Sequence, residues 1–521
     1  MPLDPIHIGF WLAALGLPLL HFADPEVAEA EPRHVYRSVL LMPVLAFLAS
    51  LDSLQGLLGG LLAAAYGLGA AFFGWRALGR ALCRPVLLWA EVGLAAAWIW
   101  VIGGGVWLFV AASGTRLLGF GGIWALLTAA HFHAAGFGAV AVSALLARVL
   151  GRRQLAILAL HPVAFALVAI GLTGHRWMEQ AGTVIYLILF GGQLALALSA
   201  GAHRQASGQL LLAALAVPLA TLALAADWAL GGRHLTLEQM AWLHGTVNAA
   251  GHGLLGIVAL RGHHAAIPPL KAPISNVYGG LTIGPGLVTA LNPPDPESHR
   301  GLTANFAAYI RPDWPEVDDR IVHFYEHTAD YDLAATQDWQ RGFKLGGRLF
   351  AKLAQRVGQL GLPGPGVPAG AMTSALLDID DTKDGRTSVR AWVRTWRKTG
   401  NTLYVALYSE HTQNEVRTMN IAFPLPYSNM TSILHLQPRA DGGGLTLTSL
   451  QSPGNSGNQG VYLRLENTRP WRLPLDETIE VNPEQDHLSA THQMWIFGHH
   501  FLTLRYIMQL RVKQTSTTST R

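Results

Sequence analysis

Three polar side chains recur at every fourth residue in the stretch WLHGTVNAAGHGLLG, residues 242–256. His244, Asn248 and His252 therefore share one helix face over about two turns. An imidazole exchanges a proton near neutral pH and also binds zinc, copper or iron. Small residues, which allow close helix packing, flank the three: Gly245, Ala249, Gly251, Gly253 and Gly256. We expect this face to point toward other helices.

Further ionisable residues lie in apolar stretches, where they need a partner or a task. Glu91 lies in one of them, and His131 and His133 lie in another. His131 and His133 are two residues apart, so they point about 200° apart on an ideal helix. Both reach one point only if the helix is distorted near Gly136 and Gly138. His161 and Gln193 are isolated polar residues in two more apolar stretches.

Three interpretations of these groups remain open. They could hydrogen-bond to one another and fix helix packing. They could line a path for a proton or a small solute, with an intramembrane centre made of Glu91, His131, His133, His244, Asn248 and His252. They could bind a transition metal or a haem, for which the candidate ligands are His131, His244 and His252. The sequence itself requires no cofactor.

The first half of the chain predicts an all-α membrane bundle. A helix needs about 20 apolar residues to cross the hydrocarbon. We expect about nine spans, near residues 6–22, 36–52, 54–75, 85–110, 118–147, 154–173, 180–202, 207–229 and 238–260. Basic residues follow spans three, five, seven and nine, and basic loops stay in the cytoplasm. This predicts an inner-membrane protein with its N-terminus outside and its C-terminal half in the cytoplasm.

Composition divides the chain into three parts. Residues 1–261 are apolar, residues 262–275 form a proline-rich linker, and residues 276–521 are polar. The net charge of +4 is too small to indicate nucleic acid as a partner. The expected partner of the first part is the lipid bilayer.

The segments HFHAAGFG (131–138) and HGTVNAAGHGLLG (244–256) resemble those of the YndJ-like family. The likeness covers residues 1–260. Its members are bacterial multi-pass membrane proteins of unestablished function. The resemblance implies a bacterial cell-membrane protein and a candidate transporter, and it brings no substrate and no catalytic residue.

The second half predicts an α+β domain that is mainly antiparallel β. Residues 316–359 have helical periodicity, and from residue 371 the period changes to two. A meander of this length should curl into a barrel or a strongly curved sheet. Residues 388–396 alternate small aliphatic residues with Arg390, Trp392, Arg394 and Trp396. We interpret the Arg-Trp face as partly exposed; it could instead grip an anionic headgroup, and the aliphatic face could frame a cavity for a lipid or a small apolar ligand.

The leading functional prediction is transport or binding of a small solute or proton, with a cytoplasmic ligand- or lipid-binding domain. One alternative is a metal- or haem-dependent membrane redox or lipid-modifying protein. The other is a membrane-tethered binding module. No Walker loop, Rossmann fingerprint or G-x-S-x-G motif is present in the sequence. Whether the protein is an enzyme stays open.

Overall fold

The computed structural model divides into two compact units, one of residues 1–81 and 88–266 and one that includes residues 267–521. Most of the proline-rich linker lies outside the described residues. The structure describes residues 4–23, 33–83, 88–232, 234–262, 273–283, 285–293, 299–361, 364–365, 371–397, 400, 402–413, 415–439, 443–451, 457–466 and 468–511.

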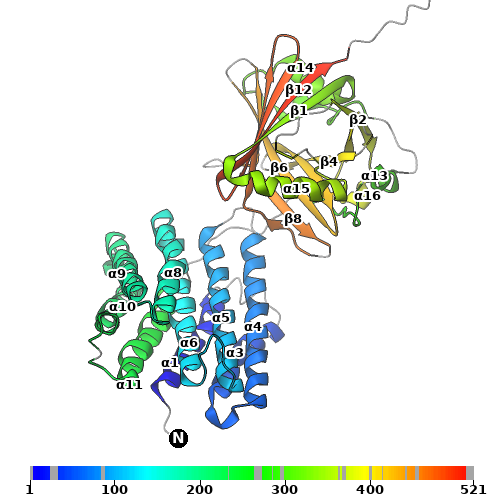
Figure 1. Cartoon of the computed structure of the whole chain (residues 1–521). Helices are drawn as coiled ribbons and strands as arrows, with labels where there is room; N and C mark the ends of the chain where they lie inside the picture. The colour runs from blue at the N-terminus through cyan, green and yellow to red at the C-terminus, as the bar shows by residue number, and fades with distance from the viewer. Residues whose placement is uncertain are drawn as a thin grey trace, which may run out of the picture. The chain divides into compact units, whose positions relative to one another are not determined.

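The first unit is built from helices that pack side by side (Figure 1). Their length and apolar composition follow from the runs of Leu, Ala, Val and Gly in this half. The helices are α1 (Pro5–Ala23), α3 (Arg33–Ser50), α4 (Leu57–Leu82), α5 (Trp89–Ser113), α6 (Ile123–His131), α7 (Ala139–Leu150), α8 (Arg152–Gly171), α9 (Arg176–Ser199), α10 (Ala206–Leu230), α11 (Leu237–Met240) and α12 (Leu255–Ala259).

Six helices of the described residues are long and apolar enough to cross a membrane. They are α4, α5, the continuous helix 123–150, α8, α9 and α10. The prediction of about nine spans is not supported. The apolar stretches of α1 and α3, Pro5–His21 and Arg37–Ser50, are shorter than the length that spanning requires. Segment 237–259 is made less apolar by its own polar residues at 244, 248 and 252.

Three short π-helices interrupt this unit at the two segments that carry the histidines. They are η2 (Phe132–Gly138), η4 (Ala241–Thr246) and η5 (Asn248–Leu254). In a π-helix each turn holds more than 3.6 residues, so side-chain directions depart from the α-helical pattern. The helix is distorted at Gly136 and Gly138, which both lie in η2, and η2 packs against η5.

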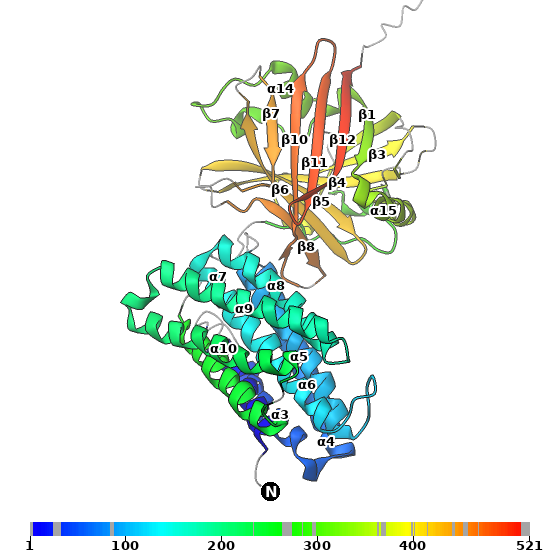
Figure 2. The same ribbon diagram turned by 60° about the vertical axis from the view of Figure 1, so that its left-hand side comes forward.

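The second unit contains a closed antiparallel barrel of ten strands. Their order is β5-β4-β3-β2-β1-β12-β11-β10-β7-β6, and β6 pairs back with β5. Figure 2 shows β10, β11 and β12 side by side in front of β4 and β5. Strands β8 and β9 extend from β6. The strands are β1 (Tyr331–Trp339), β2 (Ala371–Asp378), β3 (Arg390–Trp396), β4 (Thr402–Gln413), β5 (Val416–Leu425), β6 (Ser428–Pro438), β7 (Leu445–Thr448), β8 (Gly460–Leu465), β9 (Trp471–Arg472), β10 (Leu475–Pro483), β11 (Leu488–Ile496) and β12 (His499–Leu510).

The helical structure expected over residues 316–359 is wrong in its middle. Helix α14 (Asp319–Glu326) and helix α15 (Lys344–Val357) flank strand β1, which pairs with β2 and β12. Burial along β1 alternates from Tyr331 to Ala335, which is the period of a strand. Helix α14 packs into the aromatic cluster at one end of the barrel interior, where Phe324 contacts Trp392.

The two faces of β3 have roles opposite to those expected. Trp392 and Arg394 are only 2% and 5% exposed, and Trp392 belongs to the cluster that fills the barrel interior. The aliphatic face of Val389, Ala391 and Val393 forms a separate outer core with residues of the segment 277–291. The expectation of a partly exposed Arg-Trp face is therefore wrong for Trp392 and Arg394, which point into the closed barrel, whereas Arg390 and Trp396 are half-buried.

Candidate functional site

His133 is held in a fixed orientation on the π-helix η2. Its Nδ1 donates to the Ala129 carbonyl at 2.7 Å, so its Nε2 accepts a hydrogen bond from the Tyr66 hydroxyl. The ring is fully buried and meets Phe10 edge-on, with 5.0 Å between ring centroids. Gly104 makes room for it, since a Cβ there would lie 2.4 Å from His133 Cε1. Both ring nitrogens have hydrogen-bond partners, as expected for a side chain that fixes helix packing.

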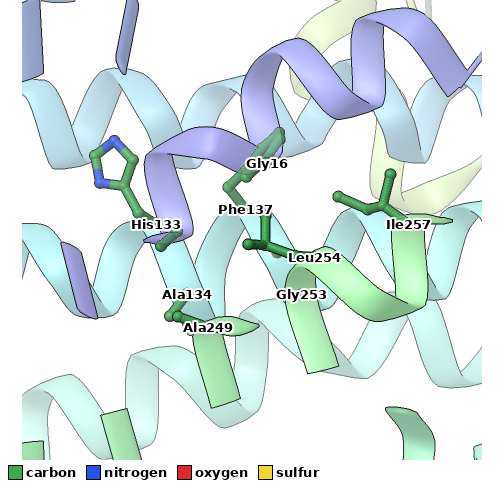
Figure 3. A pocket seen from close by; sticks show the side chains of 10 residues that line it. Gly16, His133, Ala134, Phe137, Ala249, Gly253, Leu254 and Ile257 are labelled. Carbon is green, nitrogen blue, oxygen red and sulfur yellow. The ribbon is translucent and has the colours of Figure 1, made fainter. Parts of the chain in front are cut away.

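A small cavity lies where α1, η2 and η5 meet (Figure 3). Its volume is about 10 Å³, close to the smallest that holds one water. Apart from His133, whose nitrogens are already bonded, its lining is apolar or glycine: Ala13, Gly16, Ala134, Phe137, Gly138, Ala249, Gly253, Leu254 and Ile257. This cavity offers no free polar group to a solute.

His244 and Asn248 form a second group with Thr221 of α10. His244 Nδ1 donates to the Thr221 carbonyl at 3.1 Å. Asn248 Nδ2 donates to the Thr221 hydroxyl at 2.8 Å and to the His244 carbonyl at 2.7 Å. His131 lies near enough to His244 for an electrostatic interaction, and its own Nδ1 donates to the Leu127 carbonyl at 2.9 Å. The structure therefore brings three predicted residues together.

His252 belongs to a third group, which joins it to His161 of α8 and Gln193 of α9. His252 Nδ1 donates to the Ala214 carbonyl at 3.1 Å, which leaves Nε2 as an acceptor without a partner. Gln193 Nε2 donates to the Ser143 hydroxyl at 3.0 Å and lies 3.3 Å from His161 Nε2. The His161 Nδ1 and the Gln193 Oε1 have no partner.

Aromatic rings surround this third group. Phe190 contacts both imidazoles, with its ring centroid 5.9 Å from that of His161 and 5.0 Å from that of His252. Tyr186 stacks on Phe190 at 5.7 Å, and its buried hydroxyl also has no partner. His161 and His252 interact electrostatically. We call His161, Gln193, His252 and Tyr186 the unsatisfied cluster.

Glu91 does not join the histidines. Its carboxylate makes a bidentate ion pair with Arg148 at the end of α7, with Nε–Oε1 at 2.6 Å and Nη2–Oε2 at 2.9 Å. The side chains are 9% and 5% exposed. Such a pair ties α5 to α7.

Four residues of these groups, His161, Gln193, Tyr66 and Tyr186, were not part of the predicted centre. His161 and Gln193 each stand alone in an apolar helix, where one polar residue does not reveal its partner. Tyr66 and Tyr186 carried no signal beyond their apolar surroundings. Within the described part of the chain, no group of three or more His, Cys, Asp or Glu side chains is arranged to hold a metal ion.

Apolar helices that enclose polar groups, followed by a ten-stranded barrel, define a multi-pass membrane protein with a separate barrel domain. The chain belongs to the YndJ-like family. The profile described as YndJ-like protein matches residues 11–252. A relative in Bacillus subtilis (strain 168), described as an uncharacterized membrane protein YndJ, is 30% identical over 426 residues, 78% of this chain and 76% of the relative.

The match to the Bacillus subtilis relative is longer than the helical part of this chain. Because 426 residues exceed the 261 of the helical part, the similarity extends into the barrel. No solved structure matches this chain.

Proposed function

We propose that the helical unit carries protons, or binds a small polar solute, at the unsatisfied cluster. The observation that supports this is the set of buried polar atoms without partners: the His161 Nδ1, the His252 Nε2, the Gln193 Oε1 and the Tyr186 hydroxyl. A polar group that is buried and unsatisfied costs about 1–3 kcal/mol, so it needs a compensating role. The set holds both donors and acceptors, as recognition of a polar molecule requires.

Histidine is the proton carrier in this proposal, and Glu91 is not. Glu91 is paired with Arg148. If Glu91 left this pair to carry a proton, the buried Arg148 guanidinium would lose its counter-ion. His244 and His133, whose Nδ1 atoms are bonded to backbone carbonyls, orient the π-helices that carry them. His252 and His133 lie on η5 and η2, which pack against each other.

We further propose that the protein lies in the inner membrane with its N-terminus outside. Arg148 and Arg153 lie at the junction of α7 and α8, and Arg204 lies between α9 and α10, two helices later in the chain. Both junctions then face the cytoplasm. The proposal requires a seventh crossing in addition to the six long apolar helices, and segment 237–259, which packs along α10, would supply it and return the chain to that side. The barrel is then a cytoplasmic ligand-binding domain.

The proposal is tested with purified protein in sealed vesicles that contain a pH-sensitive dye. A potassium gradient with valinomycin drives protons across the membrane. We expect proton flux with the native protein, and flux at the level of empty vesicles with His161→Gln or His252→Gln. His7→Gln is the matched control, because His7 is also a buried imidazole but lies apart from the cluster, bonded to the Ser50 carbonyl.

Native mass spectrometry of the same proteins tests whether the unsatisfied cluster binds a small polar solute. A bound small polar molecule that disappears in His161→Gln and His252→Gln, and stays in His7→Gln, supports binding. If the native protein shows neither flux nor a bound molecule, or if the cluster variants behave like His7→Gln, the proposal is wrong and the polar groups serve packing.

A further inference from the structure

Arg394 of β3 projects into the interior of the barrel and is surrounded by aromatic rings. Its guanidinium carbon lies 3.4 Å from the centroid of the Trp392 ring, 4.7 Å from that of Tyr404 and 5.6 Å from that of Tyr506. The guanidinium also donates a hydrogen bond to the Tyr506 hydroxyl. The residue is 5% exposed. The core of the barrel therefore contains a buried cation.

Several hydrogen-bond donors at this point have no acceptor. The Arg394 Nε and Nη1 atoms and the Trp392 Nε1 are buried and unpartnered. Ser374 stands directly across the strand pair from Arg394, and its hydroxyl is unpartnered as well. One positive charge and several N–H and O–H donors therefore lie close together inside the barrel.

Arg394 differs from the other buried arginines of this unit. Arg386 pairs with Asp384 at 2.6 Å, and Arg472 pairs with Asp476 at 2.7 Å. Among the residues that the structure describes, no carboxylate makes an ion pair with Arg394 at 4.0 Å or less. The carboxylate of Glu477, which faces the same interior, is already bonded to His492 at 2.6 Å.

Ring stacking alone does not balance this burial. A cation–π contact contributes about 2 kcal/mol when desolvated, whereas an uncompensated buried charge costs several kcal/mol. An anion from outside the chain would supply both the missing charge and the missing acceptors. A monoanion fits best, because one guanidinium and neutral donors balance one negative charge.

We propose that Arg394 binds the carboxylate of a small amphiphilic acid inside the barrel. The apolar side chains around Arg394 suit an apolar chain, and the methionines among them can repack to admit one. The apolar residues of this cluster include Leu333, Met372, Met419, Leu434, Leu436 and Met508. This inference rests on the ligand-binding role proposed for the barrel and is independent of the role proposed for the helices.

The test is a calorimetric titration of the full-length protein in lipid nanodiscs with octanoate, with empty nanodiscs as the blank. Octanol tests the need for charge, and octyl phosphate at pH 8 tests a dianion. We expect saturable binding of octanoate, and affinity lower by about tenfold or more for octanol and octyl phosphate. Arg394→Met should weaken octanoate binding by about tenfold or more while the protein still unfolds cooperatively, because an apolar side chain replaces a buried cation.

Arg390→Met is the matched control, because Arg390 lies four residues away on the same strand and its Nη1 is bonded to the Gly301 carbonyl at 2.7 Å. It should retain octanoate binding. If Arg394→Met fails to fold, Tyr506→Phe removes the hydroxyl that Arg394 contacts and should still weaken binding. Binding that is unchanged in these variants, equal binding of octanol, or no binding to the native protein would overturn the inference. The vesicle flux assay would be unaffected by any of these results, so the two proposals fail separately.

Discussion

Gly138 of η2 and Gly253 of η5 lie in close contact: a Cβ on Gly138 would lie 3.6 Å from the Gly253 Cα. The two π-helical segments therefore meet backbone to backbone, in the way that small residues allow. These are the same two segments that carry His133 and His252. Their approach brings the polar groups of separate helices into one region of the unit.

A large residue at this contact should disturb the packing of η2 on η5. We expect Gly138→Leu to lower the free energy of unfolding by about 1–3 kcal/mol, because overpacking forces the backbones apart. Gly138→Ala should be tolerated, since its Cβ would make ordinary contacts. Gly245→Leu is the control, because a Cβ at Gly245 meets nothing within 4 Å. Thermal unfolding in detergent measures all three, and equal losses for Gly138→Leu and Gly245→Leu would contradict the prediction.

The Glu91–Arg148 ion pair should be structural. Glu91→Gln should cost about 3–5 kcal/mol, because it leaves the Arg148 guanidinium buried without its partner. The double variant Glu91→Gln, Arg148→Met should recover part of that loss, since no charge stays buried. The exposed pair Arg311–Asp313 is the comparison, and Asp313→Asn should change stability by about 1 kcal/mol or less. A loss in Glu91→Gln no greater than in Asp313→Asn would show that the buried pair does not stabilise the bundle.

Two neighbouring glycines of α15 should respond in opposite directions to alanine. A Cβ on Gly347 would lie 2.7–2.8 Å from three atoms of the Trp339 indole, so Gly347→Ala should push α15 off the barrel and cost about 1–3 kcal/mol. A Cβ on Gly346 meets nothing within 4 Å, so Gly346→Ala should stabilise the helix by about 0.5–1 kcal/mol. Chemical denaturation measured by tryptophan fluorescence distinguishes them. The same sign for both changes would refute the docking of α15 on Trp339.

The stability of the barrel should fall in acid through Glu477. Burial raises the pKa of this carboxyl, but hydrogen bonds from His492 and Ser432 and the charge of His492 outweigh burial, so its pKa lies below the usual value of 4.5. A lowered pKa stabilises the folded state above the unfolded pKa, and that contribution is lost as the pH falls through the folded value. Between pH 6 and pH 3 the native protein should therefore lose more stability than Glu477→Gln. Parallel curves of melting temperature against pH would contradict this assignment.

Sequence reasoning succeeded where a pattern depends on local geometry. Alternation with period two correctly indicated the hairpins from residue 388 onward, because successive side chains of a strand point to opposite faces. The apolar runs identified the six long helices. The same reasoning failed at β1, where the strand period from Tyr331 to Ala335 was short and lay between two true helices.

The sequence by itself determined that polar side chains are enclosed in an apolar helical half and that a β-rich half follows it. Only the tertiary structure decided their partners: Glu91 with Arg148, His252 with His161 and Gln193, and Arg394 with the aromatic rings inside the barrel. The reason is physical. Helical and strand periods state which residues share a face, whereas the neighbour that covers that face is set by how distant segments pack and by the closure of the sheet.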